Sequence, residues 1–116
     1  MRSKTDGGLV PHVIRLAQMH GCWAWRANSG RAIGASGKPV LLCEPGTPDV
    51  LVVTKAGRLC EIECKSKTGK QRDSQRKWEE RARQYGVRYA VVRSVLDADR
   101  VLRVWALDVH HDDDVK

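Results

Sequence analysis

Carboxylate and ammonium side chains occur inside apolar segments of this chain. Asp49 follows Pro48 at the start of one apolar run, and Glu63 and Lys65 stand two positions apart in another. Two carboxylates about 5 Å apart on neighbouring strands repel each other, by roughly 3 kcal/mol at an effective dielectric constant near 20. A divalent cation bound by both would offset this repulsion, and hard oxygen ligands suit Mg²⁺ or Mn²⁺. A metal beside a lysine is suited to phosphodiester hydrolysis, because it polarises a phosphoryl oxygen and lowers the pKa of bound water.

The turn between the two apolar runs sets how they pair. A two-residue turn would put an alanine at positive φ, whereas a three-residue loop requires this only of its last residue, Gly57. Thr54 then pairs with Arg58, and the same register places Asp49 opposite Glu63. The sequence therefore predicts a β-hairpin whose open end carries two facing carboxylates.

Alternation along the second strand separates polar residues from the core. Glu61, Glu63 and Lys65 share one face. The opposite face is apolar and carries Val50, Val52, Cys60, Ile62 and Cys64. One interpretation is that the acids line a solvent-facing sheet edge, with Lys65 as a neutralising neighbour. Gln75 favours a metal site instead, because it lies on the inward face of the next predicted helix, where an apolar residue is expected.

The segments around the hairpin predict an α/β fold in which helices flank a mixed β-sheet, in the order α-β-β-β-β-α-β-α. Helices are predicted over 9–20, 73–85 and 96–109, strands over 22–27, 39–44 and 87–94, and a loop over 28–38. The second helix has Asp73 or Ser74 as its cap and Gly86 as its stop. Its predicted buried stripe is Gln75, Trp78, Ala82 and Tyr85.

Length and composition limit the function classes. The 116 residues predict a single domain over 1–116 with a frayed tail over 109–116. The net charge of +7 and a pI near 9.6 favour a polyanionic partner such as nucleic acid. No apolar run has the length of a signal peptide or membrane span, so we expect a cytosolic protein without a membrane partner. Four cysteines in apolar runs suit reduced thiols, and Cys60 and Cys64, about 13 Å apart on one strand, cannot share a zinc ion.

Basic residues gather after the hairpin and along the second predicted helix. Such a band would hold a nucleic-acid backbone and make binding depend on salt, and it comprises Lys67, Lys70, Arg72, Arg76, Lys77, Arg81 and Arg83. The alternative is a solvated helix surface in which Glu79 and Glu80 are interleaved. His110 and His111 precede three aspartates, but in a frayed tail we expect them to be solvated rather than bound to metal.

Pro48-Asp49, followed by "ECK" at 63–65, resembles the P-D…(D/E)-x-K signature of restriction-endonuclease-like nucleases. A wider ordered set is similar to the virus-type replication–repair nuclease domain (VRR-NUC) and comprises "WRANSG" at 25–30, "PGTPDVLVV", "GRLCEIECKSKTGK", Gln75 and "GVRYAVVRSV". The resemblance spans about residues 9–97. It implies a restriction-endonuclease-like core and a divalent-metal DNA endonuclease of prokaryotic or phage origin. In stand-alone form it implies a homodimer that acts on branched DNA such as four-way (Holliday) junctions.

The resemblance also implies roles for individual residues. Asp49, Glu63 and the main-chain carbonyl of Cys64 would bind the metal, Lys65 would be the catalytic lysine, and Gln75 would support the site. The DNA-binding candidates are Arg26, Asn28, Ser29, Lys67, Lys70, Arg72, Arg76 and Lys77. The family usually has an acid on its first helix, which is absent from 9–20 here. Its possible replacements are Asp6, His12 and Gln18, so the number of metal ions stays open.

Two other functions compete with the nuclease. One is a non-catalytic DNA-binding module on the same fold, against which the intact Asp49, Glu63 and Lys65 argue. The other is an oligomerisation module that makes its contact through the last helix, with Val104, Trp105 and Leu107. Self-association is compatible with a nuclease, because cutting both strands of a junction requires two sites.

Overall fold

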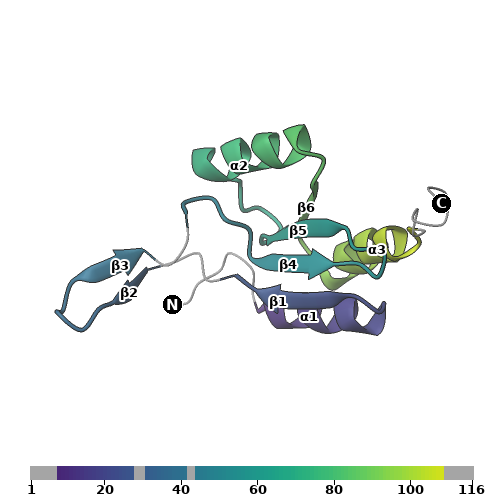
Figure 1. Cartoon of the computed structure of the whole chain (residues 1–116), viewed down its shortest axis with the longest axis horizontal. Helices are drawn as coiled ribbons and strands as arrows, with labels where there is room; N and C mark the ends of the chain where they lie inside the picture. Colours follow the sequence, from purple (N-terminus) through teal and green to yellow (C-terminus); the bar gives the residue numbers. More distant parts are fainter. Residues whose placement is uncertain (1–7, 28–30, 42–43, 109–116) are drawn as a thin grey trace.

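The computed structural model describes residues 8–27, 31–41 and 44–108. At its centre is a four-stranded mixed sheet in the order β1-β4-β5-β6 (Figure 1). Strands β1 (Trp23–Arg26), β4 (Val50–Val53) and β5 (Leu59–Cys64) are successively antiparallel, and β6 (Arg88–Val92) runs parallel to β5. The helices are α1 (Leu9–Met19), α2 (Asp73–Gln84) and α3 (Val95–Ala106). The α/β fold with a mixed sheet flanked by helices is thus confirmed.

The hairpin of β4 and β5 has the register that its turn predicts. The Thr54 amide donates to the Arg58 carbonyl at 3.0 Å, and Gly57 adopts φ +84°. Val50 pairs with Ile62, which places Asp49, one residue earlier, beside Glu63 at the open end. The connection is the three-residue loop, as expected for a turn whose last position only glycine accepts without strain.

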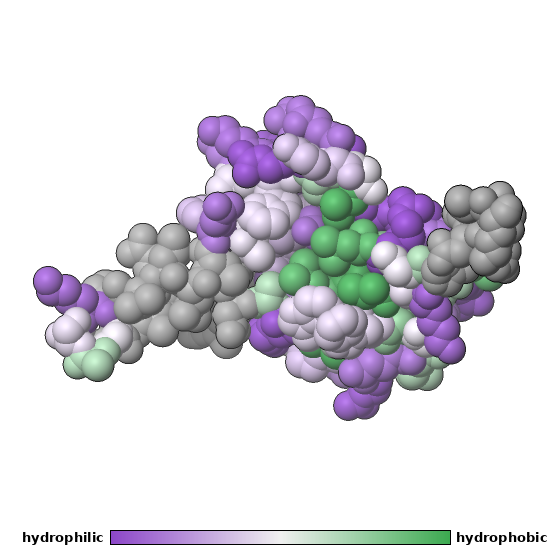
Figure 2. All heavy atoms as spheres, in the orientation of Figure 1, coloured by the Kyte–Doolittle hydropathy of each residue, from purple (hydrophilic) through white to green (hydrophobic). Residues whose placement is uncertain are grey.

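The hydrophobic core lies on one face of the sheet, between the strands and helices α1 and α3 (Figure 1). The predicted alternation is confirmed, since Val50, Val52, Cys60, Ile62 and Cys64 are all buried there. Helix α2 packs on the other face, against β6, and its outer side chains are hydrophilic (Figure 2). Apolar surface remains visible beside α2 in the same view. The polar face of β5 therefore points toward α2 and away from the core.

One predicted loop contains a strand. Residues Arg31–Ile33 form β2, which pairs antiparallel with β3 (Pro39–Leu41) in a separate two-stranded sheet that projects from the main body (Figure 1). The Gly34 amide donates to the Lys38 carbonyl at 2.8 Å, and Gly37 takes φ +84°. The prediction of one continuous loop over 28–38 is therefore wrong, because a strand of three residues is too short to give a periodic signal. The chain therefore has one more strand before the β4–β5 hairpin than the sequence predicts.

Three details of the helices differ from prediction. Helix α2 begins at Asp73 with Arg72 as its N-cap, so Asp73 and Ser74 lie in the first turn rather than at the cap. Tyr85 follows the helix and is 80% exposed, instead of completing its buried stripe. Trp105 is buried in the core, so of the three residues proposed for an oligomer contact only Val104 and Leu107 are exposed.

Some predictions concern residues outside the described ranges, namely Asp6, Asn28, Ser29 and the tail 109–116 with His110 and His111. Within the described ranges, no helix combines the length and apolar character that crossing a bilayer requires.

Candidate active site

Asp49 is fixed by the loop that enters β4. Gly46 takes φ +90° and lies so close to α2 that a Cβ there would come within 2.3 Å of the Ser74 carbonyl oxygen. Pro48 is fully buried, and the Asp49 carbonyl accepts the Ala27 amide at 2.9 Å. The carboxylate in turn accepts the Cys64 amide through Oδ2 at 2.8 Å. This bond ties the start of β4 to the end of β5 and brings the main chain of Cys64 beside Asp49.

Glu63 is held by a network that begins at the N-terminus of α2. Its side chain is almost entirely buried, and its Oε2 accepts the Gln75 side-chain amide at 2.7 Å. Gln75 is the third residue of α2, and its own Oε1 accepts the Arg72 amide at 2.8 Å. One glutamine therefore caps the helix and orients the carboxylate, which explains the polar residue at an inward position.

Lys65 completes the cluster. Its ammonium lies 3.6 Å from Glu63 Oε2, and both side chains are only 4% exposed. The Lys65 amide donates to the Val92 carbonyl at 2.9 Å, which extends the pairing of β5 with β6. The structure thus brings Asp49, Glu63, Lys65 and Gln75 together where β4 begins and β5 ends, on the side of the sheet facing α2.

The electrostatics of Glu63 are unfavourable for a charged side chain. Burial, followed by the nearby charge of Asp49, raises its pKa to about 8, although Lys65 and Arg72 act in the opposite direction. Among the described residues, no hydrogen-bond donor reaches Glu63 Oε1, which is buried. A buried carboxylate oxygen of this kind costs free energy unless a donor or cation approaches it.

A divalent cation fits this arrangement. The donor set would be carboxylate oxygens of Asp49 and Glu63 with the main chain of Cys64, which are the oxygen ligands that Mg²⁺ and Mn²⁺ accept. In the described ranges, no group of three or more His, Cys, Asp or Glu side chains is placed to hold a metal. Two carboxylates alone would therefore need carbonyl, water or phosphate oxygens to complete the coordination.

Comparisons with known proteins identify the family of this chain. A family model described as the VRR-NUC domain matches residues 38–96, just over half of the chain, and this segment contains every residue of the cluster. The chain belongs to the VRR-NUC domain family. A solved structure titled "VRR_NUC domain" superposes with a TM-score of 0.63 at 21% identity, covering 86% of this chain and 96% of that chain. At this identity the likeness shows the fold. Comparison with curated proteins gives no match.

In this VRR-NUC domain, two further contacts near the site were not foreseen. Arg93, just after β6, donates from Nη1 to the carbonyls of Ser66 and Gly69, at 2.7 and 2.6 Å. It thereby holds the loop that follows Lys65. The arginine belonged to the motif "GVRYAVVRSV", but its role depends on a contact across 24 or more residues, which no local pattern encodes.

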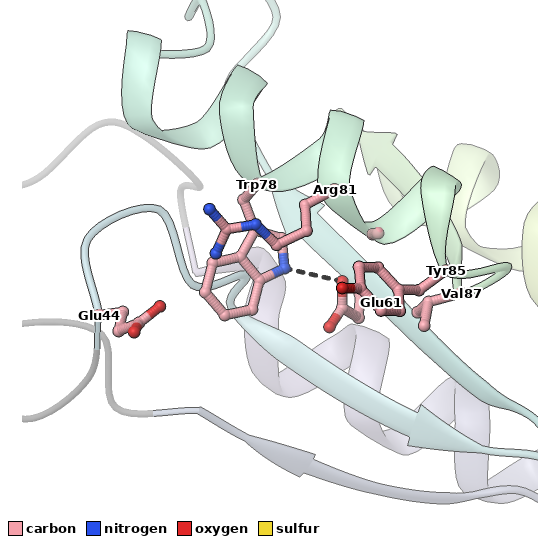
Figure 3. A pocket seen from close by; sticks show the side chains of 7 residues that line it. Glu44, Glu61, Trp78, Arg81, Tyr85 and Val87 are labelled. Atoms are coloured by element: carbon pink, nitrogen blue, oxygen red, sulfur yellow. Dashed lines mark hydrogen bonds between the residues drawn. The ribbon is translucent and has the colours of Figure 1, made fainter.

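The second unforeseen contact involves Glu61, which stays outside the metal cluster. Its buried carboxylate accepts the Trp78 indole N–H at 2.9 Å through Oε1 (Figure 3). Burial raises the pKa of Glu61, and the bond from Trp78 acts against that rise. Glu61 therefore shares the face of Glu63 as predicted but faces a different part of α2.

All the predicted DNA-binding residues within the described ranges are exposed, namely Arg26, Lys67, Lys70, Arg72, Arg76 and Lys77. Arg76 pairs with Asp73 and donates to the Gln71 carbonyl at 2.8 Å, so part of its charge is already compensated. His12 and Gln18, the described candidates for the missing helix acid, are exposed on α1, which packs against the opposite face of the sheet.

Proposed function

We propose that this protein is a Mg²⁺- or Mn²⁺-dependent DNA endonuclease that cuts branched DNA. One observation carries the proposal. Glu63 is buried beside a second carboxylate and an ammonium, with an oxygen that no donor in the described part of the chain satisfies. A site built only for stability would place an apolar or fully paired residue there. The chain also belongs to a nuclease family, which supports the same chemistry.

In the proposed reaction, Asp49, Glu63 and the Cys64 carbonyl hold the cation. When bound, the cation supplies Lewis-acid polarisation of the phosphate and lowers the pKa of a bound water. Gln75 keeps Glu63 oriented through its side-chain amide. The Lys65 ammonium, beside Glu63, would stabilise the negative charge that develops on the phosphate or orient the attacking water.

Branched DNA as the substrate, and a homodimer as the working form, are parts of the same proposal. The exposed lysines and arginines along 67–77 give the surface beside the site a positive charge suited to a phosphate backbone. Paired cuts in a four-way junction need two sites related by symmetry, which a dimer provides. Sedimentation of the protein alone and bound to a junction measures the oligomeric state.

The test is cleavage of labelled junction, flap, duplex and single-stranded DNA in Mg²⁺, Mn²⁺ and EDTA. Asp49→Asn and Glu63→Gln remove the charges while retaining an acceptor oxygen for the Cys64 amide and for Gln75, respectively. We expect both variants to bind DNA and to lose cleavage. Wild-type rates in both would refute the assignment. Binding without cleavage by the wild type in every metal would instead indicate a non-catalytic DNA-binding module.

A further inference from the structure

A trench runs along α2 on the side that faces the loop before β4. Near the middle and C-terminal end of the helix it forms a hollow of about 180 Å³ with Glu61 on its floor and Trp78 and Tyr85 along one wall (Figure 3). A second hollow, of about 330 Å³, continues toward Ser74 in the first turn of the helix. The two hollows share Glu44, Trp78 and Arg81, so they adjoin each other along α2, and together they are called the trench.

The polar groups of the trench are of two kinds. Lys77 and Arg81 are exposed cations on the helix side. Glu61 on the floor and Glu44 on the opposite wall are hydrogen-bond acceptors (Figure 3). A purely anionic ligand would be repelled by the two carboxylates. A purely apolar one would leave a buried carboxylate unsatisfied, since Trp78 engages only Oε1 of Glu61 and the described residues offer Oε2 no hydrogen bond.

Two aromatic side chains, Trp78 and Tyr85, line the first hollow. Trp78 is half-buried and fixed by its bond to Glu61, whereas Tyr85, which directly follows the helix and lines the same hollow, is 80% exposed. Aromatic rings with cations beside them are how proteins bind unpaired bases without reading a duplex.

The trench is placed close to the candidate metal site. Glu61 and Glu63 lie two residues apart on the same face of β5, which corresponds to about 7 Å along a strand. Their partners on α2, Trp78 and Gln75, are three residues apart. A phosphate at Glu63 would therefore have the base of a neighbouring nucleotide within reach of the trench.

We propose that the trench along α2 receives an unpaired nucleobase next to the phosphate that is cut, stacked on Trp78 and Tyr85, with Glu61 accepting from its exocyclic amino group. The proposal rests on the proposed function for the position of the phosphate. It accounts for the mixed lining, because a nucleotide offers an anionic backbone to Lys77 and Arg81 together with N–H donors to a carboxylate. It also relates the trench to branched DNA with a single-stranded arm, such as a flap, whose unpaired bases are cheap to extrude.

The experiment measures DNA binding in EDTA, so that it does not depend on cleavage. A labelled flap DNA is compared with a set in which an abasic nucleotide replaces each position around the branch in turn. Tyr85→Ala is the test variant, and the substitution should leave the fold intact because Tyr85 is highly exposed. Tyr85→Phe retains the ring and is the matched control. Val104→Ala on α3, 64% exposed on another part of the molecule, controls for general loss of surface apolar area.

We expect one abasic position to weaken wild-type binding about 5-fold or more, within the range for one stacked base. Tyr85→Ala should produce a similar loss and should make that abasic position neutral, whereas Tyr85→Phe and Val104→Ala should behave like the wild type. The proposal would be overturned if the affinity losses from the abasic site and from Tyr85→Ala multiplied when the two changes were combined. It would also be overturned if no abasic position weakened binding. Unchanged DNA binding with a lower sedimentation mass in Tyr85→Ala would overturn it in favour of a protein interface.

The role of Glu61 has its own readout. At the sensitive position, wild-type protein should prefer cytosine over thymine, and Glu61→Gln, which retains an acceptor for Trp78, should reduce that preference. Equal affinity for the two bases would overturn the part assigned to Glu61. If the abasic position and Tyr85→Ala are coupled in DNA affinity but the protein cleaves DNA in no metal, the trench proposal is supported and only the nuclease proposal is refuted.

Discussion

Without a metal ion, the wild-type protein should become less stable as pH rises, and Glu63→Gln should remove the part of this loss that comes from Glu63. The carboxyl has a folded-state pKa of about 8 against an ordinary value of 4.5, chiefly because it is buried and then because Asp49 is near. The folded state therefore keeps the proton over a range in which the unfolded chain has released it. The stabilising contribution of the protonated carboxyl is complete below pH 4.5 and is lost as pH rises through about 8.

The expected magnitude follows from the width of that range. Each pH unit between the two pKa values removes about 1.4 kcal/mol of stability. Between pH 6 and pH 9 the loss from this one group is on the order of 3 kcal/mol, because the slope disappears above the folded pKa. Glutamine cannot ionise, yet its carbonyl oxygen still accepts from Gln75. Its stability curve should lack this component while the other titrating groups contribute equally to both proteins.

The measurement is urea unfolding followed by tryptophan fluorescence in EDTA, from pH 6 to pH 9, for the wild type and Glu63→Gln. We expect the free-energy difference between the two proteins to shift by on the order of 3 kcal/mol in favour of the variant across this range. Added Mn²⁺ should cancel the shift by stabilising only the wild type. Parallel pH profiles for the two proteins would refute the assigned burial and ionisation of Glu63.

Three further predictions concern the metal and the loops that frame the site. Because a cation competes with the proton on Glu63, Mn²⁺ affinity measured by calorimetry should rise about tenfold per pH unit up to about pH 8 and then level off; a flat profile would contradict the assignment. Gly46→Ala should destabilise more than Gly57→Ala in urea unfolding, since both glycines have positive φ but only at Gly46 does a Cβ meet backbone; equal losses would show that α2 yields. Arg93→Met removes the Nη1 donor that serves both the Ser66 and Gly69 carbonyls, so limited proteolysis should cut within 66–69 sooner than in the wild type; identical digestion would show that the loop is held otherwise.

The sequence predicts the hairpin and its acids correctly because their placement follows from local rules. One glycine decides the loop length, the loop length decides the register, and strand alternation then assigns Glu61, Glu63 and Lys65 to one face. The juxtaposition of Asp49 and Glu63 follows from the same register, since both belong to this hairpin. Gln75 could be recognised as well, because a polar residue at an apolar position of a helix is itself a signal.

Other features depend on contacts between distant segments and leave no such signal. The packing of Gly46 against α2 and the hold of Arg93 on the loop after β5 appear only when the fold is assembled. Tyr85 satisfies the helical spacing for burial, but the helix ends one residue before it and its side chain is 80% exposed. Periodicity predicts which side of a helix a residue occupies, not whether a partner lies opposite.

Helix α2 emerges as the element on which both proposed sites depend. Its first turn contacts Gly46 and supplies Gln75, whose amide nitrogen donates to Glu63 and whose oxygen accepts the amide of the N-cap residue Arg72. Its later turns supply the aromatic and basic side chains of the trench. Because one rigid helix positions both sets, a phosphate at the carboxylates and a base in the trench would be held at a fixed separation. A ligand that bridges the two would gain from that rigidity, since neither end needs to be ordered again once the other is bound.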